Sequence, residues 1–200
     1  MNTLETQEKT CTSFAGIKMI ASGDLKHVAQ MTKKAIDSGE KEFVLIFDDT
    51  TAQPIEIDFR GTAKDVLSRL GDSAPTEVKH AEQTRGPGRP KLGVVAREVT
   101  LLPRHWDWLN SQPGGASVAL RKLVDEARHA NADKDTIRQS QEAAYRFMSA
   151  MAGNLPGFEE STRALFAGDK AKFKDLTEDW PGDVRSYAQK LAAAALSQRS

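Results

Sequence analysis

The stretch "VVAREVTLLPRHWDWLNSQPGGASVALRKLVDEAR", residues 94–128, sets the order of elements in the middle of the chain. Its β-branched and apolar start predicts a strand over 94–102, and Pro103 suits the first position of a short helix. "PGG" ends that helix, and Ser117 is the predicted cap of the next one. The second helix carries a stripe at helical spacing that we expect to be buried: Leu120, Leu123, Val124 and Ala127.

Residues 72–93, upstream of this stretch, read as a flexible basic linker. They contain three prolines, three glycines and few large apolar residues, so burial cannot offset the entropy of ordering them. Within them, "GRPK" at 88–91 resembles the core of an AT-hook, in which Gly-Arg-Pro lies in the minor groove of A·T-rich DNA. The resemblance implies that Arg89 and Lys91 enter that groove. A plain basic linker is the alternative interpretation.

Residues 13–71 have the pattern of a small, sandwich-like domain that mixes strands and helices. Apolar runs suit strands, Asp24 can cap a helix, and Thr62 with Asp65 resembles a capping box. The predicted elements, in order, are a strand at 14–21, a helix from Asp24 to Gly39, a hairpin of strands at 42–47 and 54–59, and a helix opened by Thr62.

Residues 131–200 are predicted to be helical, in four segments that end at Gly, Pro or the last residues. The segments are 133–153, 156–168, 169–180 and 181–198. Their expected core residues are Phe147, Met148, Met151, Leu155, Phe158, Leu165, Phe166 and Phe173. With residues 13–71 and 94–130, this region gives a predicted α+β fold class.

Composition describes an ordinary globular chain, with 200 residues of which 39% are hydrophobic and 28% charged. It has no apolar run of the roughly 18 residues that a membrane helix needs. Residues 1–12 lack the basic start and apolar core of a secretory signal. The single cysteine, Cys11, cannot form an internal disulfide. We therefore expect a cytoplasmic protein with no membrane association.

The formal net charge of zero conceals an uneven distribution. Residues 1–83 carry 10 Lys/Arg and 14 Asp/Glu, whereas residues 84–146 carry 11 and 7, and residues 147–200 carry 7 of each. A basic middle third is typical of a segment with an anionic partner, although a solvated face has the same composition.

The segment "REVTLLPRHWDWLNSQPGGASVALRKLVDEAR", residues 97–128, resembles the ribbon-helix-helix family of bacterial repressors. In that family a strand pairs with its copy from a second subunit, and the two-stranded ribbon enters the major groove of DNA. Leu102-Pro103 and Ser117 stand where the family has its Leu-Pro step and its capping serine, which implies a homodimer and a phosphate contact near Ser117. The strand phase stays open, because either Arg97 or Glu98 can face the DNA. Use of the segment for packing or dimerisation alone is the alternative.

Taken as a whole, the chain is similar to a bacterial family known only as a domain of unknown function. The similarity is carried by "FAGIKMIASGDL", "GRPKLGVVAREVTLLPRHWDWLNSQPGGASVALRKLVDEAR" and "FMSAMAGNLPGFEESTRALFAGD", and spans about residues 14–175. It implies a bacterial protein without an assigned activity.

No pattern in the sequence predicts catalysis. The four histidines lack metal-ligand spacing, and the serines lack a nucleophile elbow. Asp48 and Asp49, with Glu56 and Asp58 on the next predicted strand, could gather around a cation, but turn formation and strand alternation explain them equally well. We therefore expect no enzyme activity, no metal and no cofactor.

These observations predict a protein associated with duplex DNA, a dimeric transcription regulator or accessory factor. The residues expected to contact DNA are Arg85, Arg89, Lys91, Arg97, Arg104 and Ser117. The alternative is a non-catalytic protein-interaction module, of the antitoxin or adaptor kind, that uses residues 94–128 for dimerisation.

Overall fold

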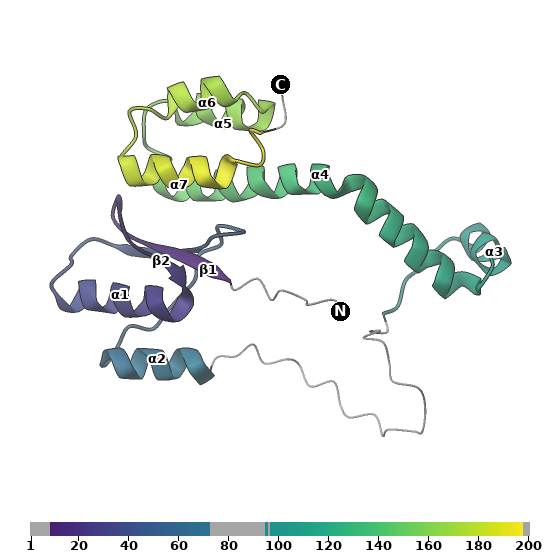
Figure 1. Cartoon of the computed structure of the whole chain (residues 1–200), viewed down its shortest axis with the longest axis horizontal. Helices are drawn as coiled ribbons and strands as arrows, with labels where there is room; N and C mark the ends of the chain where they lie inside the picture. Colours follow the sequence, from purple (N-terminus) through teal and green to yellow (C-terminus); the bar gives the residue numbers. More distant parts are fainter. Residues whose placement is uncertain (1–8, 73–94, 96, 198–200) are drawn as a thin grey trace, which may run out of the picture. The chain divides into compact units, whose positions relative to one another are not determined.

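A computed structural model describes residues 9–72, 95 and 97–197 (Figure 1). The chain divides into two compact units, residues 1–74 with 134–200, and residues 75–133. We call their described parts the core unit (9–72 and 134–197) and the α3–α4 unit (95 and 97–133). The fold is α+β, as predicted. All of the predicted linker after Asp72 lies outside the described residues.

Three antiparallel strands form the sheet of the core unit in the order β2-β1-β3: β1 Thr10–Ala15, β2 Lys18–Asp24 and β3 Val44–Asp48. The prediction of one strand over 14–21 was wrong, because the chain turns at Gly16 and Ile17. Gly16 has φ +53, a left-handed conformation that glycine adopts without a Cβ clash. A two-residue loop with glycine first is typical of a tight hairpin.

The predicted strand over 54–59 was also wrong. After the Ile55 amide donates to the Ile46 carbonyl (2.8 Å) and Phe47 bridges Pro54, the described chain forms no further strand pairing there. Arg69 instead donates to the carbonyls of Asp58 and Arg60. The predicted alternation is confirmed, because Ile55, Ile57 and Phe59 pack against the buried core. The side chains of this segment are thus partly buried although its backbone does not form the hydrogen-bond ladder of a strand.

Two helices follow the sheet strands, and both begin as the sequence predicts. The Asp24 carboxylate accepts hydrogen bonds from the Lys26 and His27 amides, each at 3.0 Å. The Thr62 amide donates to Asp65 at 2.8 Å, while the Asp65 amide donates to the Thr62 hydroxyl at 3.3 Å. These caps satisfy amides that have no partner inside the helix. The two helices are α1 Leu25–Asp37 and α2 Ala63–Asp72.

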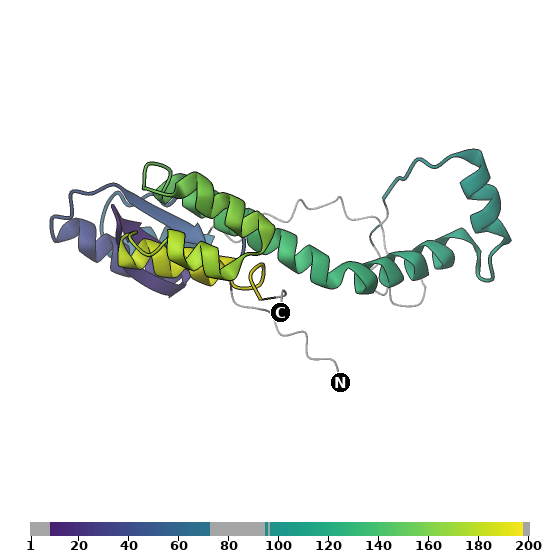
Figure 2. The same ribbon diagram turned by 90° about the horizontal axis from the view of Figure 1, so that it is seen from above.

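The remaining helices are α3 Pro103–Ser111, α4 Gly115–Met151, α5 Phe158–Ala167, α6 Lys170–Leu176 and α7 Gly182–Ala192. Helices were predicted at each place, but the prediction of two separate helices, one capped by Ser117 and one over 133–153, was wrong, because α4 joins them. The helix α4 has 37 residues, and Figure 2 shows it without interruption. The joining residues 129–134, "HANADK", include neither Gly nor Pro, so nothing in them breaks a helix.

The core unit has three layers, with the sheet between helices. One face packs against α1, where Cys11, Ala21, Val28 and Ile46 are buried together. Phe14 and Phe47 on the other face meet α4 and α7. The predicted separate regions 13–71 and 131–200 therefore share one core (Figure 1).

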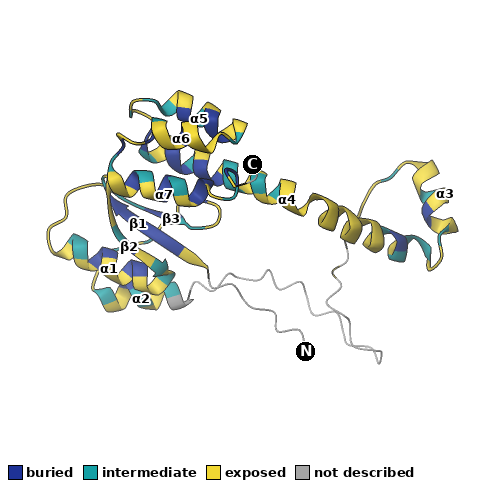
Figure 3. Cartoon of the chain, turned by 45° about the horizontal axis from the view of Figure 1, so that its top comes forward, coloured by how far each residue is buried: buried dark blue, intermediate teal, exposed yellow. Residues whose placement is uncertain are grey.

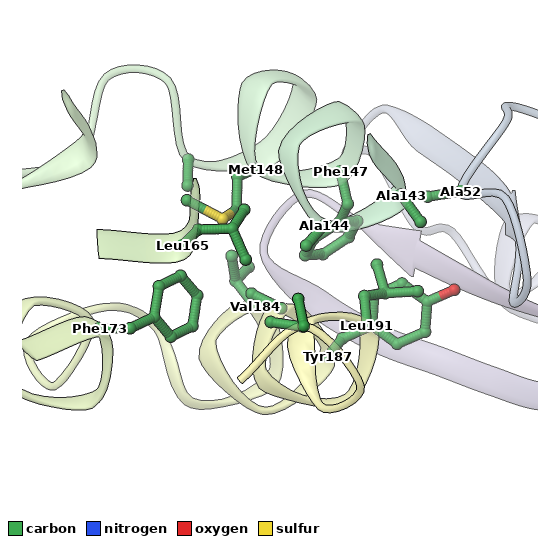
Figure 4. Packing of buried hydrophobic residues seen from close by; sticks show 14 of the residues in the cluster. Ala52, Ala143, Ala144, Phe147, Met148, Leu165, Phe173, Val184, Tyr187 and Leu191 are labelled. Carbon is green, nitrogen blue, oxygen red and sulfur yellow. The ribbon is translucent and has the colours of Figure 1, made fainter. Parts of the chain in front are cut away.

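Aromatic rings form the centre of that shared core. Phe147 of α4 lies 5.4 Å from Phe14, 5.2 Å from Phe47 and 4.6 Å from Tyr187 between ring centroids. Figure 4 shows Phe147 and Tyr187 side by side with the smaller apolar residues around them. Phe166, which was expected in the core, is instead 51% exposed on α5, so that expectation was wrong.

The free edge of the sheet at β2 is capped by α7. The Met19 amide, on the outer edge of β2, donates to the Asp183 carboxylate at 2.8 Å. A side chain from the start of α7 thus takes the place of a neighbouring strand at this amide.

We expect Phe147→Ala to lower the free energy of unfolding of the chain by roughly 3–5 kcal/mol, because it leaves a cavity among the other rings. Phe166→Ala, the matched control on an exposed ring, should cost less than about 1 kcal/mol. Urea unfolding followed by circular dichroism measures both. Equal losses in the two variants would contradict the central role of Phe147.

Candidate interaction surface

The α3–α4 unit consists of an extended segment, a short helix and the start of a long one. Leu102 is extended (φ −67, ψ 149), and Pro103 opens α3. A turn at 112–114 joins it to α4, with φ +87 at Gly114 and +75 at Gly115. Two successive left-handed positions explain the glycine pair. The predicted cap at Ser117 was wrong, because α4 begins at Gly115 and Ser117 lies exposed in its first turn.

This unit buries very little of its own apolar surface. Only Leu109 and Ala119 are buried among its described residues. Trp108 is 51% exposed and Val124 54% exposed. The stripe predicted to be buried is therefore largely uncovered, with Leu123, Val124 and Ala127 all exposed (Figure 3).

A hollow of about 370 Å³ lies between Leu101, α3 and the start of α4, and the exposed Trp108 and Leu123 help to line it. Its lining is mostly apolar: Leu101, Trp108, Leu109, Leu120 and Leu123. Arg104 and His105 complete the wall. A mostly apolar surface bordered by exposed polar side chains is typical of a macromolecular interface.

The segment before α3 does not form the predicted strand within one chain. The structure assigns no strand at residues 95 and 97–102, and among the described residues no backbone hydrogen bond joins 97–101 to another segment. Val99 and Leu102 are exposed on it. Pairing of this segment with a second copy stays a prediction.

The residues predicted to contact DNA are only partly described. Arg97 is exposed in the segment that leads into α3, Arg104 is exposed in the first turn of α3, and Ser117 lies across the turn on α4. Arg85, Arg89 and Lys91 lie outside the described residues. The structure thus describes three of these residues in one unit, and the other three precede that unit in the sequence.

A second group of polar residues lies around Asp49 in the core unit, and sequence reasoning did not predict it. The Asp49 side chain is only 8% exposed, and three groups donate to it. They are the Thr12 hydroxyl at 2.7 Å, the Tyr187 hydroxyl at 2.8 Å and the Lys190 ammonium at 2.8 Å. Tyr187 and Lys190 share one face of α7, but no sequence signal links them to Asp49, which lies 138 and 141 positions earlier.

The other acidic residues considered for a cation do not join Asp49. The Asp48 carboxylate accepts from the Thr50 and Thr51 amides, and Asp58 pairs with Arg60. Among residues 9–72, 95 and 97–197, no three His, Cys, Asp or Glu side chains are grouped so as to hold a metal ion.

A family model described as "Uncharacterized protein conserved in bacteria (DUF2239)" matches residues 10–192. The chain belongs to this family. The match begins at the first residue of β1 and ends at the last residue of α7, so the DUF2239 family includes both units. No curated protein and no solved structure matches the chain significantly. Within the described part of this DUF2239 chain, no helix is long and apolar enough to cross a bilayer.

The electrostatics of the Asp49 cluster favour a structural role in this DUF2239 member. Burial raises the pKa of Asp49, but hydrogen bonds from Lys190, Thr12 and Tyr187 outweigh it, so the pKa lies below its usual value. Burial, together with Asp49, holds the pKa of Tyr187 well above its usual range. Burial also raises the pKa of the Cys11 thiol to about 11. The Tyr187 hydroxyl and the Cys11 thiol therefore stay protonated at neutral pH. The hydrogen bonds to Asp49 connect α7 to the sheet.

We expect Asp49→Asn to lower the free energy of unfolding by roughly 1–3 kcal/mol at pH 7. The folded pKa of Asp49 is lowered, so the ionised carboxylate stabilises the fold above its unfolded pKa of about 4, and this contribution is lost as the pH falls further. The difference in free energy of unfolding between wild type and Asp49→Asn should therefore become smaller below about pH 4. Urea unfolding at pH 7, 4 and 3 measures it.

Asp179→Asn, at an exposed carboxylate before α7, is the matched control, and we expect it to change stability by less than about 0.5 kcal/mol. If the difference in free energy of unfolding between wild type and Asp49→Asn stays constant from pH 7 to pH 3, the charge of Asp49 contributes nothing to stability.

Proposed function

We propose that this protein associates with duplex DNA as a homodimer, as a transcription regulator or accessory factor in the bacterial cytoplasm. The observation that carries the proposal is the small buried core of the α3–α4 unit, in which Leu109 and Ala119 alone are buried among the described residues. A unit of this size with two buried side chains needs a partner to cover its apolar face. Residues 97–128 also resemble the ribbon-helix-helix family, whose members pair as dimers.

The charge next to this unit supports DNA as the ligand. Arg85, Arg89 and Lys91 precede it in the sequence, and Arg97 and Arg104 are exposed within it. Each lysine or arginine that neutralises a phosphate releases condensed counterions, which favours binding at low salt. Ser117, in the first turn of α4, stands where the resemblance implies a phosphate contact.

A non-catalytic interaction module is the second candidate, and one observation favours it. From 95 to 133 the chain carries five basic residues and five acidic ones, so the unit itself is electrically neutral. A neutral, apolar surface suits a protein partner as well as it suits a second copy. On this interpretation the basic residues before the unit contribute only solubility.

The dimer is tested first, through Trp108. We expect the full chain to be dimeric at micromolar concentration and Trp108→Ala to weaken self-association at least about tenfold, because large aromatic side chains dominate such interfaces. Sedimentation equilibrium measures both. Phe43→Ala, which removes a 78% exposed ring from the core unit, is the control and should leave association unchanged. A monomeric wild type would exclude the paired ribbon.

Binding to duplex is tested by its dependence on salt. With five neutralised phosphates, the logarithm of the binding constant should fall by roughly 4 to 5 per tenfold rise in salt. Replacing Arg89 and Lys91 together by Ala should reduce this slope by about 2. Fluorescence anisotropy with a labelled A·T-rich duplex and a G·C-rich competitor measures the slope and the sequence preference.

The control removes the same charge elsewhere, with Lys170→Ala and Lys172→Ala on the exposed side of α6, and should leave the slope almost unchanged. A dissociation constant weaker than about 100 µM at low salt would reject DNA, since non-specific attraction alone is stronger. Retained dimerisation with no DNA binding would instead favour the interaction module.

A further inference from the structure

The hollow of the α3–α4 unit has the size and the lining of a small-molecule site. Its volume of about 370 Å³ falls within the roughly 300–1,000 Å³ that ligand pockets occupy in proteins. Four leucines and Trp108 form most of its lining, and one of these leucines, Leu109, is only 3% exposed. All of the lining residues lie between 101 and 123, so the hollow belongs to one compact unit. It offers an apolar wall to a molecule much smaller than a protein.

The polar side chains of the lining favour an anion. They are Arg104 and His105, and the lining includes no carboxylate. Asp107, the acidic residue of α3, is not part of the lining, and the first turn of α3 contains no acidic side chain. Arg104 forms no ion pair with any residue that the structure describes. An arginine guanidinium carries paired donors that match the two oxygens of a carboxylate.

The proportion of apolar to polar lining decides which anion suits the hollow. A phosphate or a nucleotide is strongly hydrated and needs many polar donors, whereas this lining has two polar side chains beside five apolar ones. A molecule with an apolar body and one carboxylate matches both parts. Its body removes leucine and tryptophan surface from water, and each buried methylene raises affinity by roughly a factor of four.

We infer that this hollow binds a small carboxylate with an apolar body, of the class of medium-chain fatty acids. Arg104 pairs with the carboxylate, while Trp108, Leu120 and Leu123 contact the chain. The lining holds a single tryptophan among leucines, which suits a flexible aliphatic chain better than a flat ring system. The inference goes beyond the proposed function, because it needs neither DNA nor a second copy of the protein.

Isothermal titration calorimetry of the full chain with octanoate tests the site. We expect a dissociation constant on the order of 100 µM, within the affinity per atom that small ligands reach. Hexanoate should bind roughly tenfold more weakly, because it buries two fewer methylenes. Octanol, the uncharged probe of the same length, should also bind roughly tenfold more weakly, because it has no carboxylate for Arg104.

Two pairs of variants separate the charge from the apolar lining. Arg104→Gln should weaken octanoate binding roughly tenfold and leave octanol binding unchanged. Leu123→Ala should weaken the binding of both probes roughly fivefold, because it removes apolar contact from either one. The matched controls are Arg128→Gln and Val124→Ala, at exposed positions of α4 outside the lining, and both should leave binding unchanged.

Octanol that binds the wild type as tightly as octanoate does would overturn the inference. So would octanoate binding that Arg104→Gln leaves unchanged, or no binding at about 5 mM octanoate. Sedimentation equilibrium gives the oligomeric state of the same samples. A dimer that does not bind octanoate would reject the ligand site alone, and a monomer that binds octanoate would reject the dimer alone.

Discussion

The packing of four aromatic rings joins the two ends of this chain into one core. Phe14 and Phe47 come from the sheet, and Phe147 and Tyr187 come from helices more than 90 residues later. A sheet of three strands, covered on one face by α1, leaves Phe14 and Phe47 without cover unless α4 and α7 return to it. The N-terminal residues therefore do not form a complete domain by themselves, and the Asp49 cluster adds a polar fastening at the same junction.

Sequence reasoning succeeded where the deciding interaction is local. Asp24 and the Thr62–Asp65 pair begin helices with bonds to amides two or three residues away. It failed at Gly16, because a tight turn needs only one positive φ and can lie inside an apolar run. Asp49 was considered only for a cation, and its actual partners could not be predicted, since they come from β1 and α7 and carry no periodic signal.

The α3–α4 unit shows a different limit of sequence reasoning. The stripe of Leu120, Leu123 and Val124 was identified correctly as apolar, but its burial was not, because burial depends on what lies against it. Within the described part of the α3–α4 unit, Leu101 and residues of α3 line one hollow with Leu120 and Leu123. The extended residues before Pro103 have the same property, because a strand exists only when another strand pairs with it. In the proposed homodimer, the second copy supplies that pairing.

The contact between Asp183 and the Met19 amide also bears on solubility. An uncovered strand edge is a template onto which another chain can add by backbone pairing, which is how many proteins begin to aggregate. At β2 the Asp183 carboxylate accepts the hydrogen bond of the Met19 amide, so this amide is not available to an incoming strand. The charge of Asp183 also disfavours the approach of an apolar strand. On the other side, Pro54 bridges Phe47 and the Ile55 amide donates to the Ile46 carbonyl, which covers part of β3. Each edge of this small sheet thus carries a feature that hinders backbone pairing with another chain.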